Sequence, residues 1–392
     1  MSPVNLQLTL PGYRIIRWES NLVMRVYVEA LEAPRQCLCC GGDRLRSKGR
    51  YERRVRHLAC FGHQSELVIA CRRYRCLACQ RTFVQPLPGV GRCRRSTDPW
   101  RNEIYERHHH GICARTLSRR EGLSEATVGH IYAQYTERKA KERLSLDCPL
   151  VLGIDEHTLH RGQRFATTFC DLKNRRVFDI SPGKSAAELS GFLQSLRGRD
   201  RVRVVCIDLS ASYRLLVRRF FPRAVIVADR FHAIRIVGQH LMRVARQLVP
   251  ALGWNRSWLG LLRTRPDHLE PDQKRRLQAL LAQYPALQPI YEVKESLCAL
   301  LRLKGQSKRA CRHHVARLLD FIRLLRESGL EAALTLAKTL SDWSEEIGRM
   351  WRFSRTNAVT EGFHRKMKLI QRRAYGFRSF SNYRLRVIAQ CG

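Results

Sequence analysis

Apolar and polar residues alternate over residues 13–31, in the segment YRIIRWESNLVMRVYVEAL. A period of two is typical of strands that bury one face, so this segment predicts short β-strands. Around Pro99 the apolar spacing changes to the helical one. The segment CARTLSRREGLSEATVGHIYAQYTERKAKE predicts two helices, with a turn at Gly122 and an N-cap at Ser124.

The second of these helices carries one apolar stripe, formed by Val128, Ile131 and Tyr135. Two helices joined at a glycine are the outline of a helix-turn-helix, although the outline is also common in proteins that never touch DNA. Residue types on the neighbouring face can reach base edges, and arginines nearby suit phosphates. The candidates for these contacts are Thr127, His130 and Gln134 for bases, and Arg115, Arg119 and Arg120 for phosphates.

Three runs rich in β-branched residues follow, and each ends on an aspartate. LVLGID ends on Asp155, RVVCID on Asp208 and AVIVAD on Asp229. A helix-sized crossover separates the last two runs, which requires parallel strands. Ligands of open parallel sheets bind beyond the carboxyl ends of the strands. We therefore expect the three aspartates to meet at one edge of a sheet.

Between Asp155 and Asp208 the sequence predicts a hairpin, with its turn at Lys173 and Asn174, and then a helix. Residues 236–351 break from this rhythm and predict an all-helical block whose helix ends are marked by prolines. We expect its tryptophans in the core rather than as base-stacking platforms. They are Trp254, Trp258, Trp343 and Trp351.

Charge then narrows the choice of partners. The 392 residues carry a net charge of +38, spread through nearly the whole chain, which attracts phosphate backbones by counterion release. DNA or RNA is the expected partner. No stretch reaches the roughly 18 apolar residues of a membrane span, and the N-terminus lacks the layout of a signal peptide. We expect several domains, no membrane contact, and a cytoplasmic location at the nucleoid.

The fifteen cysteines predict metal binding or burial rather than disulfides, because the cytoplasm keeps thiols reduced. Two CxxC pairs supply the four thiolates of a tetrahedral, structural zinc site: Cys37 with Cys40, and Cys76 with Cys79. The gap between the pairs exceeds the roughly 15–20 residues usual in a zinc ribbon. Neighbouring residues that could replace one ligand are Cys39, Cys60, Cys71, His57 and His63.

Acids gathered in so basic a chain need a cation between them, and Mg²⁺ prefers oxygen ligands. Two Mg²⁺ ions would activate water or a 3′-hydroxyl on one side of a phosphodiester and stabilise the departing oxygen on the other. Residues 347–392 contain a single acid, Glu361, on a predicted helix. Its polar side also carries Asn357, Arg365 and Lys368. An ion pair from Glu361 to Arg365 is the plain alternative to metal binding.

These segments resemble the DDE transposases of bacterial insertion sequences, in particular the ISL-three branch, over nearly the whole chain. The resemblance is carried by the two CxxC pairs, the helix-turn-helix, LGIDEHTLHRG, VVCIDLSASYR, FPRAVIVADRFH and RTNAVTEGFHRKMKLIQRRAYGFRSFSNYRLR. It implies a ribonuclease-H-like core in which two acids lie on adjacent strands and a third on a late helix. The implied catalytic ligands of Mg²⁺, for which Mn²⁺ can substitute, are Asp155, Asp208 and Glu361. Asp229 and His232 match a supporting Asp-x-x-His element.

Residue by residue, some choices stay open. Glu156 competes with Asp155 but would face the opposite side of a strand. Asn357 either orients Glu361, contacts DNA or simply begins the helix. His157 and His160 are expected to be exposed in a basic loop rather than to touch substrate. Arg365 and Lys368 are further candidates for DNA contact.

The expected organisation is a multidomain α/β protein whose catalytic core is interrupted by a helical insertion. Its parts are a zinc-binding domain (1–95), a helix-turn-helix domain (96–146), the first part of the core (147–235), the insertion (236–351) and the last part of the core (352–392).

The resemblance implies a transposase that binds the terminal inverted repeats of an insertion sequence through its N-terminal half and transfers the cut ends to target DNA. Because two ends must be held together, a homodimer or larger assembly is expected. The alternatives are a non-catalytic DNA-binding regulator and a structure-selective nuclease on the same core.

Overall fold

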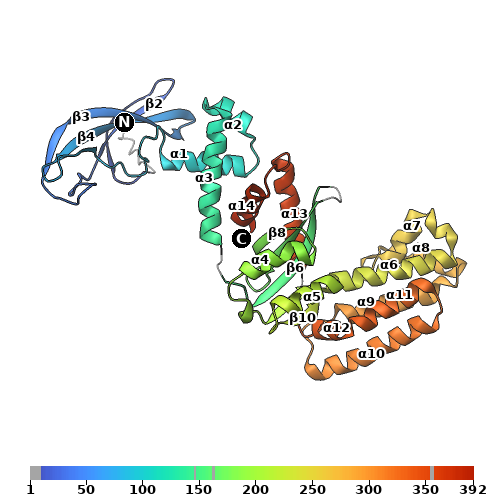
Figure 1. Ribbon diagram of the computed structural model, residues 1–392. Helices are drawn as coiled ribbons and strands as arrows, with labels where there is room; N and C mark the ends of the chain where they lie inside the picture. Colours follow the sequence, from blue (N-terminus) through green and yellow to red (C-terminus); the bar gives the residue numbers. More distant parts are fainter. Residues whose placement is uncertain (1–9, 145–146, 161–163, 354–356) are drawn as a thin grey trace. The chain divides into compact units, whose positions relative to one another are not determined.

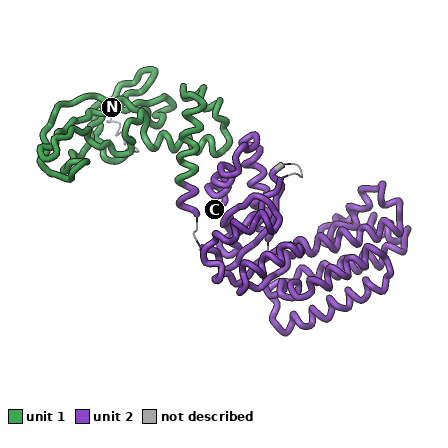
Figure 2. The backbone as a smooth tube through the Cα atoms, viewed as in Figure 1, with its two compact units in different colours: residues 1–138 green, residues 139–392 purple. Residues whose placement is uncertain are grey.

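The computed structural model describes residues 10–392 except 145–146, 161–163 and 354–356 (Figure 1). The chain forms two compact units, residues 1–138 and 139–392 (Figure 2). The first unit contains both CxxC pairs and most of the segment expected to bind DNA. The second contains all three aspartates and the helical block, in a mixed α/β arrangement. No helix among the described residues is long and apolar enough to cross a bilayer.

A mostly antiparallel sheet dominates the first unit, in the strand order β1-β2-β4-β3, with β5 also paired to β4. Its strands are β1 (Tyr13–Glu19), β2 (Met24–Ala30), β3 (Leu45–Cys60), β4 (His63–Cys76) and β5 (Thr82–Val84). The alternation in β2 buries Met24, Val26 and Val28 against Leu67 and Ile69 of β4. β2 and β4 run parallel, and the other neighbours run antiparallel.

The first unit also contains α1 (Asp98–His109), α2 (Ala114–Glu121) and most of α3 (Glu125–Arg143), whose residues from Lys139 onward belong to the second unit. Gly122 ends α2 in a left-handed conformation, with φ 59°, which glycine adopts without steric cost. Ser124 then accepts a hydrogen bond from the backbone N of Thr127 at 3.1 Å and caps α3. Leu117 of α2 and Val128 and Ile131 of α3 are fully buried in a common core. The predicted turn and cap are therefore present.

The second unit is built on a five-stranded sheet in the order β10-β9-β6-β7-β8. Its strands are β6 (Val151–His160), β7 (Arg164–Asp171), β8 (Arg176–Pro182), β9 (Val204–Ile207) and β10 (Val225–Ala228). β6, β9 and β10 are parallel, whereas β6, β7 and β8 form an antiparallel meander. The predicted hairpin and the predicted parallel pairing are both present.

Helices cover both faces of this sheet. α4 (Ala186–Ser195) and α5 (Ala211–Phe220) pack on the face that carries Ile154 and Phe169. α13 (Ala358–Arg373) and α14 (Phe380–Cys391) pack on the opposite face, against Cys170 and Cys206. The two faces follow from the period of two along each strand. A segment from the end of the chain thus lies against the first strand of the unit (Figure 1).

The helical block begins with α6 (Arg230–Leu248), which starts directly after β10 and runs through residue 236 without a break. It continues with α7 (Arg256–Arg263), α8 (Pro271–Gln283), α9 (Leu287–Arg302), α10 (Lys308–Glu327), α11 (Glu331–Asp342) and α12 (Ser344–Met350). Leu297, Leu336 and Trp351 are fully buried in the same apolar cluster as the sheet. α7 and α8 instead share a separate cluster with the end of α6.

Arg230, the first residue of α6, ties the block to the sheet. Its guanidinium is buried and donates hydrogen bonds to the backbone carbonyls of Leu301, Leu303, Met350 and Phe353 at 2.9–3.2 Å. These carbonyls lie at the ends of α9 and α12. One side chain therefore joins the ends of α9 and α12 to the start of α6, next to the carboxyl end of β10.

The prediction that all four tryptophans lie in the core is wrong for Trp254, which is 91% exposed. It follows a short 3₁₀ turn and precedes Asn255, the N-cap of α7, so it lies outside the apolar stripe of any helix. Trp343 and Trp351 are buried, and Trp258 packs partly against the cluster of α7 and α8.

Candidate catalytic and zinc sites

Three aspartates lie where the parallel strands stop pairing. Asp208 follows β9 directly, and Asp229 follows β10 and caps α6 by accepting from the backbone N of His232 at 3.2 Å. Asp155 lies inside β6, because that strand continues to His160 along its antiparallel neighbour β7. Its parallel pairing with β9, however, ends at Gly153. Asp155 is therefore also just beyond the end of the parallel ladder.

His232 joins two of these carboxylates. Its Nδ1 lies 2.7 Å from Asp208 Oδ1 and 2.7 Å from Asp229 Oδ2. The ring has one Nδ1–H, which these two carboxylate oxygens share. Asp208 Oδ1 is buried, and beyond this shared N–H no described residue donates a hydrogen bond to it. One N–H serves two carboxylate oxygens here, so a bound cation would complete the charge balance of Asp208.

The donor atoms of Asp155, Asp208 and His232 all lie within 4.8 Å of one another. Burial, and then the negative charge of Asp208, raise the pKa of Asp155 to about 7. Burial by itself would lower the pKa of His232, but the carboxylates of Asp208 and Asp229 outweigh it and raise the pKa to about 9. Protons thus supply the positive charge that the cluster needs. A divalent cation could replace these protons, because the donor atoms of Asp155, Asp208 and His232 suit such an ion.

Asn357 fixes the start of α13 against this cluster. Its backbone N donates to Asp229 Oδ1 at 3.3 Å, and its Nδ2 donates to the carbonyl of Ile154 at 3.2 Å. A Cβ on Gly153 would lie 2.5 Å from Asn357 Oδ1 and 2.9 Å from a methyl group of Leu172. Gly153 is therefore the residue that leaves room for α13 to dock. The LGID segment contained this glycine, but nothing local indicated its role.

The carboxylate of Glu361 does not belong to the cluster that the described residues form, which consists of Asp155, Asp208 and His232. Its side chain is 41% exposed, and its carboxylate lies 3.8 Å from Arg365, which is the ion pair given above as the plain alternative. Glu361 lies one turn after Asn357 and one turn before His364, on the same face of α13. Its assignment as a metal ligand stays a prediction.

His364 was missed by the sequence analysis, although it follows Glu361 by three residues on one helix face. Its Nδ1 lies 3.7 Å from Asp155 Oδ2, and its Nε2 lies 3.0 Å from Thr168 Oγ1. Thr168 is the cross-strand partner of Asp155. Burial, and then the charge of Lys368, lower the pKa of His364 to about 4. A neutral imidazole therefore lies beside Asp155.

His157 is buried, so the expectation that it is exposed in a basic loop is wrong. The extension of β6 beyond Asp155 turns His157 into the sheet face under α13 and α14. Its two nitrogens lie 3.0 Å from Thr168 Oγ1 and 2.9 Å from the Tyr383 hydroxyl. The side chain of His160 lies outside the described residues. Glu156 lies 3.4 Å from the hydroxyl of Tyr213, a residue of α5 on the other face.

The four predicted zinc ligands come together in the first unit. Their sulfur atoms lie within 4.8 Å of one another, with 3.6 Å between Cys37 and Cys79 and 3.6 Å between Cys40 and Cys76. The backbone N–H groups of Cys39 and Cys40 lower the pKa of the Cys37 thiol. This four-cysteine cluster can hold a zinc ion.

The long gap between the two CxxC pairs is filled by β3 and β4, which pair as one hairpin and return the chain to its start. Cys76 pairs with Leu45 at the base of this hairpin. None of the alternative ligands takes part in the described cluster. Cys71 is buried in the core, and His57 Nδ1 lies 3.0 Å from Thr97 Oγ1.

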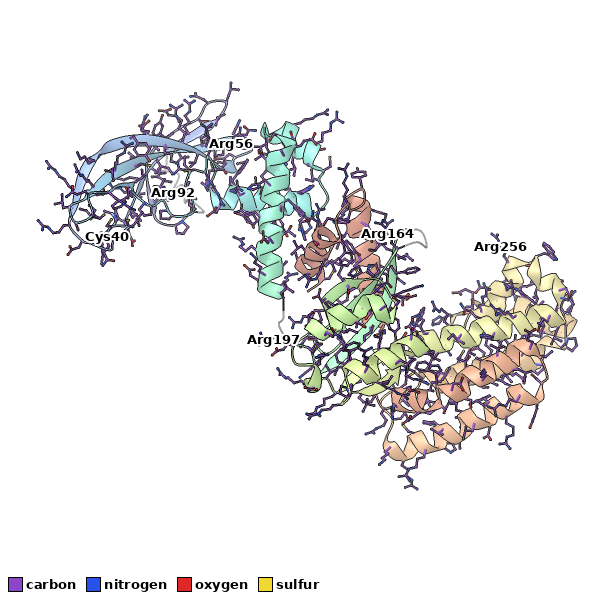
Figure 3. The ribbon with its side chains drawn as sticks, in the orientation of Figure 1. Cys40, Arg56, Arg92, Arg164, Arg197 and Arg256 are labelled. Carbon is purple, nitrogen blue, oxygen red and sulfur yellow. The ribbon has the colours of Figure 1, made fainter. Side chains whose placement is uncertain are left out.

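The candidate DNA contacts of α2 and α3 are on the surface. Arg115, Arg119, Arg120, Thr127, His130 and Gln134 are exposed, as are Arg365 and Lys368 on α13. Gln134 accepts a hydrogen bond from Arg101 at 3.0 Å, so part of its polar capacity is used within the unit. Further exposed arginines include Arg92 in the first unit and Arg164, Arg197 and Arg256 in the second (Figure 3).

A family model described as a transposase, of the DDE type named ISL3, matches residues 152–387. The chain belongs to the ISL3 family of DDE transposases. The matched region spans β6 to α14, and so contains every residue of the acid cluster. This transposase is also similar to the transposase for insertion sequence element IS1001 of Bordetella parapertussis, with 26% identity over 405 residues, 96% of this chain and 94% of that protein. DNA is therefore the partner of this transposase.

Proposed function

We propose that this transposase cuts DNA at the ends of its insertion sequence and joins the freed 3′ ends to target DNA. The observation that carries the proposal is the cluster of Asp155, Asp208 and His232 beyond the parallel strands, in which the single Nδ1–H of His232 is shared between two carboxylates. The strand order, with a three-stranded antiparallel meander and two parallel strands added to its first strand, supports a ribonuclease-H-like core. The helical block is then an insertion into that core.

In this proposal Asp155 and Asp208 hold the catalytic cation, Mg²⁺ with Mn²⁺ as a substitute. When bound, such a cation activates water or a 3′-hydroxyl and stabilises the departing oxygen of the phosphodiester. His232, held by Asp229, keeps the Asp208 carboxylate in place. Asn357 fixes α13 on the same edge. We propose Glu361 as the third carboxylate, because it lies on α13 between Asn357 and His364, which both contact the cluster or its strands.

The first unit supplies recognition of the terminal inverted repeats in this proposal. α2 and α3 act as a helix-turn-helix, with Thr127, His130 and Gln134 directed to bases and Arg115, Arg119 and Arg120 to phosphates. Zinc on the four-cysteine cluster stabilises the sheet without taking part in the chemistry. Two DNA ends must be held at once, so we propose a homodimer or larger assembly on DNA.

Cleavage of the DNA that flanks this gene tests the proposal. We expect the wild type to cut the element ends with Mg²⁺ or Mn²⁺ and to be inactive in EDTA. Asp208→Asn should lower the cleavage rate by at least about 10²-fold, because a cation supplies several kcal/mol of transition-state stabilisation. It should bind the same DNA normally in a gel-shift assay.

Asp200→Asn is a matched control, since Asp200 is an exposed aspartate outside the acid cluster. It should cut like the wild type. Cleavage that persists in Asp208→Asn would contradict the catalytic assignment. DNA binding without any cleavage by the wild type would favour the regulator instead.

A further inference from the structure

A cavity of about 770 Å³ opens between the second half of α13 and the start of α14. This volume lies within the range of small-molecule sites. The residues of its wall that the following argument uses are Lys368, Arg372, Tyr375, Phe377, Phe380 and Tyr383. They combine aromatic rings with cationic side chains, which is the composition of sites that bind single nucleotides.

Three of the aromatic rings form one cluster in the wall. The ring centres of Phe377 and Tyr383 lie 5.1 Å apart, and those of Phe380 and Tyr383 lie 6.0 Å apart. Tyr383 is fixed from behind by its hydroxyl, 2.9 Å from His157 Nε2. Tyr383 itself is buried, so it holds the half-buried rings of Phe377 and Phe380 in place, and these two form the part of the wall that a ligand can reach.

Tyr375 is the unusual member of this wall. Its side chain is 92% exposed, and its backbone has φ 52°, in the left-handed region where glycine is the usual residue. Hydrogen bonds from the N of Tyr375 to the carbonyl of Arg372 and from the N of Gly376 to that of Gln371 hold this conformation. Because its ring is 92% exposed, Tyr375 contributes little to the apolar core. Strain of this kind indicates a role in ligand binding.

The cations point to a phosphate. Lys368 and Arg372 are exposed one turn apart on α13, and no described carboxylate pairs with either. Lys368 follows His364 by one turn, on the helix face that also carries Glu361. The cavity thus continues the face of α13 that contacts the acid cluster.

We propose that this cavity receives one nucleobase that leaves the DNA duplex beside the cut. The base stacks on Tyr375 and the aromatic wall, and Lys368 and Arg372 bind the phosphate attached to it. Every base presents a flat π-face to such rings, so the site tolerates any sequence. This inference rests on the proposed function, because it takes the acid cluster as the place where DNA is cut.

Binding measurements in EDTA test the cavity independently of catalysis. The probes are duplexes of the element end in which one position at a time, on either side of the cut, is paired, mismatched or abasic. The wild type should bind the mismatched duplex about tenfold more tightly than the paired one at a single position, because a mismatched base leaves the stack more easily. No preference at any position would overturn the proposal, whether or not the protein cleaves DNA.

Variants of Tyr375 separate stacking from folding. Tyr375→Ala should lose about tenfold in affinity for the mismatched duplex, the size of one lost stacking contact, and little for the abasic one. Tyr375→Phe should bind like the wild type. Tyr375→Gly should raise the unfolding temperature, because it relieves the left-handed conformation, and yet lose affinity as Tyr375→Ala does. Equal losses on the mismatched and abasic duplexes would show phosphate contact alone and overturn base binding.

Trp254→Ala is the matched control, since Trp254 is an equally exposed aromatic residue in the helical block. It should leave the preference for the mismatched duplex unchanged. If Trp254→Ala lost as much affinity for the mismatched duplex as Tyr375→Ala, any exposed aromatic residue would have the same effect. That result would contradict a specific site at the cavity.

Discussion

Gly153→Ala should disrupt the catalytic edge through a single methyl group. The new Cβ would meet Asn357 Oδ1 at 2.5 Å and a Leu172 methyl group at 2.9 Å, and both neighbours are packed in the interior. Overpacking of this kind costs about 1–3 kcal/mol. Displacement of Asn357 would add about 1 kcal/mol for each hydrogen bond lost, to Ile154 and to Asp229.

The total for Gly153→Ala is about 3–5 kcal/mol, which lowers the unfolding temperature of the second unit by roughly 6–20 °C. Because α13 carries Glu361 and His364, we also expect cleavage to fall by more than about tenfold. Thermal unfolding followed by circular dichroism and the rate of end cleavage measure the two effects.

Two further variants make this test specific. Gly362→Ala, on α13 itself, adds a Cβ that meets nothing within 4 Å, so it should be neutral or slightly stabilising. The double variant Gly153→Ala with Asn357→Ala removes the oxygen that clashes, so its destabilisation should be smaller than the sum of the two single effects. An unfolding temperature of Gly153→Ala equal to that of the wild type, or strict additivity in the double variant, would refute the docking role of Gly153.

Three other predictions concern metal, zinc and DNA. The pKa of Asp155 is raised in the metal-free fold, so the stability that this residue contributes is present below about pH 4 and is lost as the pH rises to about 7. MgCl₂ should therefore raise the unfolding temperature more at pH 8 than at pH 5.5. The opposite trend would contradict the metal site. Cys76→Ser should release zinc, as measured by atomic emission, and lower the unfolding temperature of the first unit, whereas Cys39→Ser should keep the metal. Arg119→Ala should weaken binding to all duplexes alike and reduce the slope of log K against log salt by about one; a change in base preference would place Arg119 against a base instead.

The sequence was informative where local pattern decides the structure. Runs of β-branched residues that end on Asp155, Asp208 and Asp229 predict parallel strands and a shared edge, and the strands and their pairing are as expected. The glycine turn and the serine cap before α3 are likewise local signals. Each depends on a few neighbouring residues, so no partner elsewhere in the chain needed to be known.

The remaining features depend on partners distant in sequence. β6 continues past Asp155 because β7 pairs with it, and this extension buries His157 under α14. His364 approaches Asp155 only because α13 docks on the sheet after more than two hundred intervening residues. The gap between the CxxC pairs looked too long until the hairpin of β3 and β4 closed it. The spacing of apolar residues along the chain does not reveal contacts of this kind.

Arg230 sets a limit on how the insertion can change during evolution. Its charge is buried one residue after Asp229, and it is held by carbonyls where α9 and α12 end. Replacing the whole block by a short linker would remove these acceptors. The buried guanidinium of Arg230 would then lack hydrogen-bond partners next to the acid cluster, which would strongly destabilise the fold. The outer helices α7 and α8 pack in a separate apolar cluster with the end of α6 and the start of α9, so a change in their length disturbs the sheet less. Relatives should therefore vary in length at that far end and keep the inner layer.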